Sequence, residues 1–330
     1  METVDTLIIG AGISGLLCAT ELQRAGLSVC VLDKGRGVGG RMATRQMANG
    51  RLDHGAQYFT VRDPRFQAFV DEWQAAGIVR EWFRKIPEDT NPEGYPRYCG
   101  VNGMTDVAKH LASQLEVHRS QQVIDLVRCD GAWIAQTSAG RIFAGSQLAV
   151  TTPLPQALSL LATTGLQWAG AALPSLEKIR YRKGLAALLV LEGPSGLPAP
   201  GGLKLKEGPL TWIADNQQKG ISPDVSTVTL HADSDFAERY WDASDEVRGV
   251  LMIEAARPYL RSSVREFTCH RWGYTLPVTH WPEPYFENSG LKLVLAGDAF
   301  GGPRVEGAAL SGIAAAQNIL NRSGSLKMAL

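Results

Sequence analysis

The chain has 330 residues, of which 45% are hydrophobic, and its 33 basic residues balance its 33 acidic residues. This length is enough for two domains of ordinary size, or for one cofactor domain with a large insertion. A net charge of zero without a polybasic block argues against binding to nucleic acid or to an anionic membrane, so a small molecule is the expected partner.

The first element is an apolar strand at residues 5–9, followed by the run GAGISG and a helix with apolar residues at helical spacing. This is the context that the dinucleotide-binding fingerprint requires. Gly10 permits the tight turn, Gly12 lets the backbone approach a pyrophosphate, and Gly15 lets the helix pack closely on the strand. Since the helix N-terminus also supplies amide donors to phosphates, we predict a Rossmann-like dinucleotide site.

The second strand, LSVCVLD, ends at Asp33, where an acidic side chain can accept hydrogen bonds from the adenosine ribose hydroxyls. An ordinary solvated aspartate and an NAD site are both compatible with this residue alone. A second glycine-rich signal runs from Arg36 to Thr44. Together the two signals indicate flavin adenine dinucleotide (FAD).

The middle of the chain predicts a helix, a loop and a small meander. Residues 64–76 form an amphipathic helix, and the proline-rich and glycine-rich run 87–103 predicts an extended loop before a helix that begins near Met104. Three alternating strands within 121–150 predict a meander that returns to the main sheet. Its last strand runs into Thr151, at the carboxyl end of a buried strand, where cofactors sit in open α/β sheets.

The following segment predicts an antiparallel sheet that faces the substrate. It contains a helix at 155–162, strands at 184–192, 210–214 and 226–232, and helices near 235–259. Period-two alternation puts Thr227, Thr229 and His231 on one face of a strand, and Glu266, Thr268, His270 and Trp272 on one face of another. His231, His270 and Trp272 can therefore line a pocket, although a purely structural role stays open for each of them.

The C-terminal part completes the cofactor domain. A short buried strand, 293–296, ends in Gly297 and Asp298, whose carboxylate would bind a polyol hydroxyl. The small-residue helix after Pro303 would direct its positive end at a reduced flavin. The predicted domains are thus interleaved, with 1–63, 102–154 and 264–330 binding FAD and 64–101 and 155–263 binding substrate.

The cysteines indicate the compartment. They are scattered, odd in number and without a C-x-x-C pair, so we expect no disulfide framework, no metal site and a cytoplasmic location: Cys18, Cys30, Cys99, Cys129 and Cys269. The N-terminus lacks a basic n-region, and no uncharged apolar run reaches about eighteen residues, so we expect neither a signal peptide nor a membrane span.

The pieces GAGISG, RGVGGRMATR, LDHGAQYF, AVTTP and LVLAGDAFGGPRVEGAALSG resemble the flavin-containing amine oxidase superfamily, and LDHGAQYFT, WIADNQQKG, LHADSDF and CHRWGY are most similar to its renalase branch. The resemblance implies an α/β fold. In it a Rossmann-like FAD-binding domain, glutathione-reductase-like with p-hydroxybenzoate hydroxylase-type topology, is interleaved with a smaller substrate domain of antiparallel sheet plus helices. FAD is expected to be non-covalent because no cysteine lies between 270 and 330.

Carried over residue by residue, the resemblance also implies site residues. It implies FAD contacts at Gly10, Gly12, Ile13, Ser14, Gly15, Asp33, Lys34, Gly39, Gly40, Arg41, Met42, Gln57, Tyr58, Phe59, Val123, Thr151, Asp298, Val305, Glu306, Gly307, Ala308 and Ala309. It implies catalytic positions at His231, Trp272, His270 and Asn216, and substrate-pocket positions at Tyr58, Thr60 and Tyr95. Arg41 is expected at the pyrophosphate or at the flavin edge.

The renalase branch is similar in oxidising the 2-dihydro and 6-dihydro isomers of reduced NAD(P) and passing electrons to O2 to give H2O2, which implies metabolite repair. A dihydropyridine is already an electron-rich hydride donor, so its site needs orienting groups more than acid–base groups. Two alternatives stay open. One is a non-catalytic FAD module. The other is an amine or polyamine oxidase that uses Lys204 or Lys206 near the flavin, although LKLKEG also fits a solvated edge strand. Basic residues that could contact substrate phosphates, or be merely solvated, are Arg180, Arg182, Lys183, Arg265 and Arg271.

Overall fold

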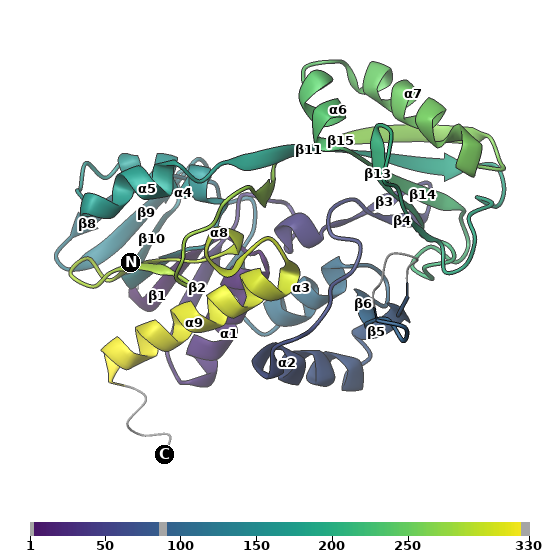
Figure 1. The fold of residues 1–330 in the computed structure, drawn as a ribbon. Coiled ribbons are helices and arrows are strands. Elements are labelled where there is room, and N and C mark those ends of the chain that lie inside the picture. The colour runs from purple at the N-terminus through teal and green to yellow at the C-terminus, as the bar shows by residue number, and fades with distance from the viewer. Residues whose placement is uncertain (1–2, 86–90, 325–330) are drawn as a thin grey trace. The chain divides into compact units, whose positions relative to one another are not determined.

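The structure, a computed structural model, describes residues 3–85 and 91–324 and divides the chain into two compact units (Figure 1). Unit 1 comprises Met1–Gly40, Ala108–Arg180 and Pro277–Leu330, and unit 2 comprises Arg41–Val107 and Tyr181–Leu276. The two units are therefore built from interleaved segments of the chain. None of the helices in the described ranges is both long and apolar enough to cross a membrane.

Unit 1 is a mostly parallel sheet with helices. Its eight strands are β1 (Thr3–Ile9), β2 (Val29–Leu32), β7 (Val117–His118), β8 (Val123–Cys129), β9 (Ala132–Thr137), β10 (Ile142–Val150), β16 (Phe286–Asn288) and β17 (Leu293–Leu295). Its helices are α1 (Ile13–Arg24), α4 (Leu154–Ala162), α5 (Leu173–Glu177), α8 (Asp298–Gly301) and α9 (Val305–Ser323), with a 3-10 turn at Gly170–Ala172. The helix α3 (Thr105–Ala112) begins in unit 2 and ends in unit 1.

The strand order β16-β17-β10-β1-β2-β7 puts β1 at the centre, parallel to both of its neighbours. Leu7, Ile8 and Ile9 are buried, as expected for a parallel strand covered on both faces. Helices α1 and α9 pack against each other (Figure 1). The predicted meander is confirmed, because β8, β9 and β10 pair antiparallel and β10 joins β1.

Unit 2 is built on a five-stranded antiparallel sheet of order β12-β13-β14-β11-β15. These strands are β11 (Tyr181–Leu191), β12 (Gly202–Lys204), β13 (Leu210–Asp215), β14 (Thr227–Ala232) and β15 (Val264–Pro277). Two strand pairs, β3 (Thr44–Met47) with β4 (Gly50–Asp53) and β5 (Val79–Phe83) with β6 (Arg97–Gly100), lie outside it. The helices are α2 (Pro64–Ala75), α6 (Ser234–Arg239) and α7 (Asp245–Ala256), followed by a 3-10 turn at Arg257–Tyr259.

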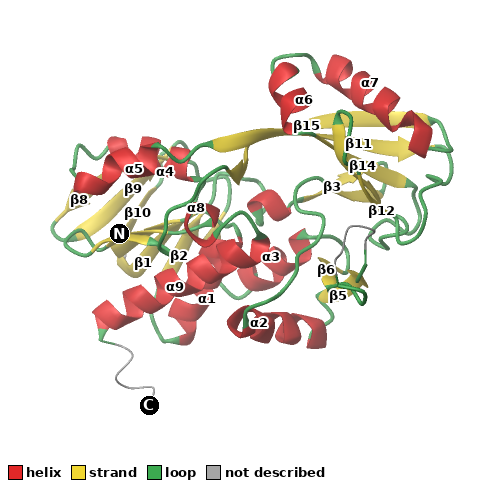
Figure 2. Cartoon of the chain, viewed as in Figure 1, coloured by secondary structure: helices red, strands yellow, loops and turns green. Residues whose placement is uncertain are grey.

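The two faces of this sheet have different partners. Helices α6 and α7 pack on one face (Figure 2), where Val228, Leu230 and Cys269 belong to the apolar core. On the other face, Thr227 and Thr229 donate hydroxyl hydrogen bonds to backbone carbonyls of the β4 segment, at 3.1 and 2.9 Å. The predicted alternation along this strand is therefore confirmed.

Several sequence predictions differ from the structure. Segments 41–63, 102–107 and 264–276 belong to unit 2, where β4 contacts β14 and β15 pairs with β11. Segment 155–180 belongs to unit 1, where α4 packs on β8. The two units are also of similar size. The prediction of a loop over 87–103 was wrong near the end of this segment, where β6 pairs with β5. Residues 87–90 of the segment lie outside the described residues.

Candidate functional site

The glycine turn of unit 1 is shaped by close backbone contacts. Gly10 has a φ of +112°, a conformation that L side chains rarely adopt. A Cβ atom on Gly15 would lie 2.0 Å from the carbonyl oxygen of Gly10, so only glycine allows α1 to pack against the turn. The Thr151 hydroxyl donates to the carbonyls of Ile9 and Gly10, at 3.1 and 3.0 Å, and so ties the end of β10 to this turn.

The N-terminus of α1 presents space and unused polar atoms. A Cβ atom on Gly12 would meet no protein atom within 4 Å, and Gly12 provides no side-chain cap for the helix. The hydroxyl of Ser14 is buried and has no hydrogen-bond partner in the protein. Because buried hydroxyls are normally paired, an open glycine beside an unpartnered hydroxyl fits an anionic group such as a pyrophosphate.

The second glycine motif joins the first. The amide of Gly39 donates to the carbonyl of Ala11 at 2.8 Å. The Asp33 carboxylate accepts from the amides of Ala11 and Gly35, each at 2.6 Å, and the amide of Gln121 donates to its backbone carbonyl at 2.8 Å. Asp33 thus holds the turn in shape from the position predicted for ribose binding.

The C-terminal elements lie against the same turn. A Cβ atom on Gly312 of α9 would lie 2.1 Å from the carbonyl oxygen of Ser14, which explains the small residues of this helix. Asp298 and Glu306, at the starts of α8 and α9, are both buried carboxylates. The remaining predicted FAD residues of unit 1 lie at the start of α1, directly after Asp33, in the second glycine motif, at the start of β8 and in α9: Ile13, Lys34, Gly40, Val123, Val305, Gly307, Ala308 and Ala309.

Replacing Gly12 with alanine should leave the fold intact, because the added methyl group meets no protein atom. It should weaken FAD binding by roughly tenfold or more, since the methyl group occupies the space that a pyrophosphate needs. Gly37→Ala, which also adds its methyl group to open space, serves as the control. The measurement is the flavin-to-protein absorbance ratio after dialysis. An equal loss of flavin in both variants would contradict the assignment of the pyrophosphate to Gly12.

Unit 2 contains a buried ion pair that the sequence did not predict. The ammonium of Lys219 donates to Oδ2 of Asp53 at 2.7 Å and to the carbonyl of Gln57 at 2.6 Å, and both charged side chains are 0% exposed. The same ammonium group also lies over the ring of Trp82, 4.7 Å from the centroid. Oδ1 of Asp53 accepts from the Thr44 hydroxyl at 2.5 Å and from a backbone amide at 2.9 Å. The pair is thus fully hydrogen-bonded and neutral overall.

Three rings, of His54, His270 and Trp272, form what we call the ring cluster. The His54 and Trp272 rings are stacked at 5.3 Å with an interplanar angle of 21°, and His270 meets them edge-on at 4.7 and 4.3 Å. The indole of Trp272 donates to the carbonyl of His54 at 2.8 Å. His231 is joined to this region through Gln57, whose Nε2 lies 3.4 Å from the imidazole Nε2.

The histidines of this region resist protonation. Burial, followed by the charges of His270 and Arg45, lowers the pKa of His54 to about 3. Burial and the nearby Lys219 ammonium lower the pKa of His231 to about 4. Burial and Arg45 also lower the pKa of His270. At neutral pH this region of unit 2 therefore carries three uncharged imidazoles beside a neutralised carboxylate.

Other residues predicted for the site lie elsewhere in unit 2. Asn216 is fully buried, donates to the Thr229 hydroxyl at 3.1 Å and leaves its Oδ1 without a partner. Tyr95 is 46% exposed, and Thr60 is half-buried. Phe59 packs in the core against Phe66 and Tyr98.

Further predicted positions have protein partners in unit 2. Tyr58 packs against Phe83 and Trp212. Arg41 donates to the carbonyls of Tyr274 and Thr275, at 3.3 and 3.0 Å. Met42, like Arg41 and Tyr58 a predicted FAD residue, is buried. Their contacts with FAD, like those of Gln57 and Phe59, stay predictions.

The basic side chains are largely solvated. Lys204 and Lys206 are exposed, Lys204 within the edge strand β12, as the edge-strand interpretation expects. Lys183 and Arg265 pair with Glu238 and Glu266, and Arg180, Arg182 and Arg271 are exposed. The sequence signal that could have identified Lys219 and His54 was their position inside the motifs WIADNQQKG and LDHGAQYF.

Comparisons with known proteins agree with this architecture. Residues 8–73 match the family model of an NAD(P)-binding Rossmann-like domain, and residues 88–320 match that of flavin containing amine oxidoreductase. A solved structure of an engineered putrescine oxidase has a TM-score of 0.74 at 15% identity, and the alignment covers 97% of this chain and 99% of that one.

Two curated relatives match shorter stretches. An L-amino acid dehydrogenase from Synechocystis sp. is 36% identical over 73 residues, 22% of this chain and 16% of the relative. (S)-6-hydroxynicotine oxidase from Paenarthrobacter nicotinovorans is 27% identical over 113 residues, 33% of this chain and 27% of the relative. The matches thus span less than a third of either relative.

The second family model covers more than half of the chain, and the glycine turn of unit 1 has the space and the donors for the cofactor of that family. The cofactor is FAD, and the protein is a flavin-dependent oxidoreductase. The chain belongs to the family of flavin-containing amine oxidoreductases.

Proposed function

We propose that this protein is an FAD-dependent oxidase of isomeric reduced nicotinamide dinucleotides, the 2-dihydro and 6-dihydro forms of NAD(P), which it returns to NAD(P)+ with formation of H2O2. Such an enzyme would serve metabolite repair in the cytoplasm, with its FAD bound non-covalently. The finer p-hydroxybenzoate hydroxylase-type topology of unit 1 is part of this proposal. The residues of unit 2 that we assign to the donor are His231, His270, Trp272 and, in addition, His54.

The observation that carries the proposal is the charge state of unit 2. Asp53, the buried carboxylate that precedes His54 in the chain, is already neutralised by Lys219 at 2.7 Å. A protonated amine would need a counter-charge, and none is free in this pair. The lowered pKa values of His54 and His231 keep both rings uncharged, which suits a neutral dihydropyridine.

Unused polar atoms in the same region suit a carboxamide. Oε1 of Gln57 and Nδ1 of His54 are buried without a hydrogen-bond partner. A nicotinamide carboxamide carries two N–H donors and one acceptor oxygen, so it can pair with acceptors of this kind. We assign these two side chains to orienting the ring, and the planar surfaces of His54 and Trp272 to packing beside it.

Hydride transfer from a dihydropyridine makes little demand on acid–base groups. When bound, FAD supplies the chemistry by accepting the hydride at N5 and passing two electrons, with one further proton from solvent, to O2. The donor keeps no extra proton when it becomes NAD(P)+, so the protein needs no general base. Its side chains orient the donor and exclude water.

An amine or polyamine oxidase is the second candidate, and the likeness to a putrescine oxidase fold and the family favour it. Unit 2 also has the aromatic residues Tyr58, Trp82 and Phe83, whose faces could bind an ammonium group. The protein's own cations already lie over them, however: Arg97 is 5.5 Å from the Tyr58 ring and 5.2 Å from the Phe83 ring, and Lys219 covers Trp82.

A reductive half-reaction screen distinguishes the two candidates. Under anaerobic stopped flow, 2-dihydro and 6-dihydro NAD(P) should bleach the flavin absorbance rapidly, whereas putrescine and other primary amines should not. The rate with the dihydropyridines should change little from pH 6 to 8, because the lowered pKa values leave His54 and His231 neutral. Fast reduction by an amine, with a rate that rises with pH, would establish the second candidate instead.

His231→Ala is the matched variant for this screen. It should slow reduction by the dihydropyridines by roughly tenfold or more through loss of orientation, while bound FAD stays unchanged. Lys204→Ala, on the exposed edge strand, should leave the rate unaltered. An unchanged rate in His231→Ala would remove this residue from the donor site.

A further inference from the structure

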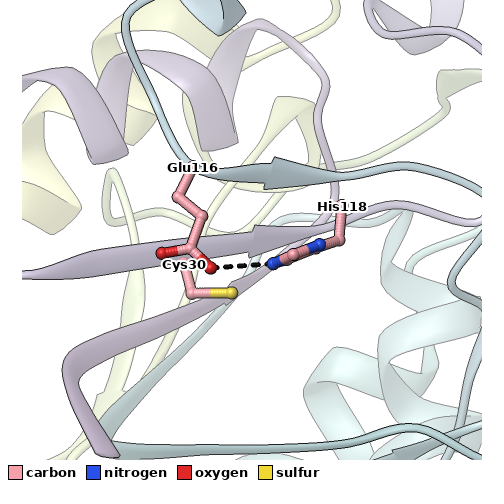
Figure 3. Close-up of side chains that lie close together, drawn as sticks. All are labelled: Cys30, Glu116 and His118. Atoms are coloured by element: carbon pink, nitrogen blue, oxygen red, sulfur yellow. Dashed lines mark hydrogen bonds and ion pairs between the residues drawn. The ribbon is translucent and has the colours of Figure 1, made fainter. Parts of the chain in front are cut away.

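We propose that Cys30, Glu116 and His118 form a binding site for one zinc-like divalent cation at the edge of the sheet of unit 1 (Figure 3). The sequence predicted no metal site, because the chain has no C-x-x-C pair. The three side chains come instead from β2, from its neighbour β7 and from the residue that precedes β7. This inference is independent of the substrate of the enzyme.

The pairing of the strands brings the three side chains to one face. β2 runs parallel to β7, with Val31 opposite Val117 and Leu32 opposite His118. Because side chains alternate along a strand, Cys30 projects to the same face as Glu116 and His118. The thiol sulfur, a carboxylate oxygen and an imidazole nitrogen all lie within 4.8 Å of one another.

The donor set is one that zinc prefers. A thiolate, an imidazole and a carboxylate are all common zinc ligands, and water can occupy the fourth tetrahedral position. Ca2+ and Mg2+ prefer oxygen ligands alone, so the sulfur and nitrogen donors select against them. Cys30 is only 3% exposed, whereas 58% of the Glu116 side chain is exposed. The thiol is therefore buried in the sheet, and the carboxylate side of the site is accessible to solvent.

The site is partly assembled without an ion. Nε2 of His118 lies 2.7 Å from a carboxylate oxygen of Glu116, and the Phe143 ring packs 4.9 Å from the imidazole. A cation would displace the thiol proton of Cys30 to solvent and take the lone pair of Nε2, leaving the ring proton on Nδ1. The exposed Arg141, whose Nη1 lies 3.4 Å from Nδ1, would then turn away into solvent.

The position of the site suggests what the cation does. The amide of Val31 donates to the carbonyl of Glu116, and the amide of Asp33 donates to the carbonyl of His118, each at 2.9 Å. A cation would add a side-chain link to these backbone bonds and fasten the short strand β7 to β2. That link would lie next to Asp33, the residue that shapes the glycine turn.

The test uses the FAD-loaded protein titrated with Co2+ and then with Zn2+. We expect one Co2+ per chain, seen as ligand-field absorption in the red, where oxidised FAD does not absorb, and displacement by one Zn2+. Cys30→Ala and His118→Ala should each weaken binding by about tenfold or more. Cys129→Ala, which removes an exposed free cysteine of the same unit, should change nothing.

Arg141→Gln provides a variant that keeps all three donors and the fold. It should tighten Co2+ binding, because it removes the cation that competes beside His118. Each of three results would overturn the proposal. The first is the absence of Co2+ bands in the wild-type protein. The others are an equal loss of Co2+ affinity in Cys129→Ala and Cys30→Ala, and weaker Co2+ binding in Arg141→Gln.

Discussion

Replacing Lys219 with methionine should destabilise the protein by about 3–5 kcal/mol, because it leaves the Asp53 carboxylate buried and unpaired. Methionine keeps most of the length of the side chain and its packing over Trp82, so the lost charge is the main change. The measurement is the urea midpoint of the FAD-loaded chain, followed by tryptophan fluorescence. The midpoint is preferred because a two-unit chain need not unfold in one step.

Two further variants separate charge from packing. Lys183→Met removes a lysine that also pairs with a glutamate, Glu238 at 3.0 Å, and also lies over a tryptophan, but in a solvated position. Its cost should stay below about 1 kcal/mol. The double variant Lys219→Met with Asp53→Asn should recover much of the lost stability, because no unpaired charge remains. If the urea midpoint falls no further in Lys219→Met than in Lys183→Met, the buried Lys219–Asp53 pair does not have the importance for stability that we assign to it.

The sequence predicted unit 1 well because its signals are local. A glycine turn needs particular residues within a few positions, and those demands are visible in Gly10, Gly12 and Gly15. The period-two alternation likewise predicted which side of β14 faces the core, because it depends only on neighbouring residues. Even the second glycine motif could be connected to the first by its spacing alone.

The missed features depend on contacts between distant segments. Lys219 follows a polar turn and has the sequence context of a solvated lysine, yet it is fully buried because Asp53 meets it from β4. His54 is adjacent to Asp53 in the same segment, and its neighbours in the ring cluster come from β15. The domain boundaries were misplaced for the same reason, since β15 joins the sheet of unit 2 by pairing with β11. No local pattern contains that information.

Lowering the pH from 8 to 5 should destabilise the protein by about 4 kcal/mol through His54 and His231 together, about 2 kcal/mol each. Burial lowers the pKa of His54 from 6.5 to about 3 and that of His231 from 6.5 to about 4. Below pH 6.5, His54 and His231 are therefore protonated in the unfolded chain but stay neutral in the folded chain. The stability that these neutral histidines provide above pH 6.5 is lost as the pH falls toward their pKa values in the folded state.

The variant His54→Phe isolates one half of this effect. It keeps an aromatic ring against Trp272 and removes the titrating group, so the difference in stability between pH 8 and pH 5 should shrink by about 2 kcal/mol relative to the wild type. Urea midpoints of the FAD-loaded proteins at intervals of one pH unit provide the comparison, and other titrating groups cancel between the two chains. An identical pH dependence in both would mean that folding does not lower the pKa of His54. His54 would then carry part of a positive charge near pH 6.5, and the support that its neutral ring gives to a neutral dihydropyridine donor would be lost.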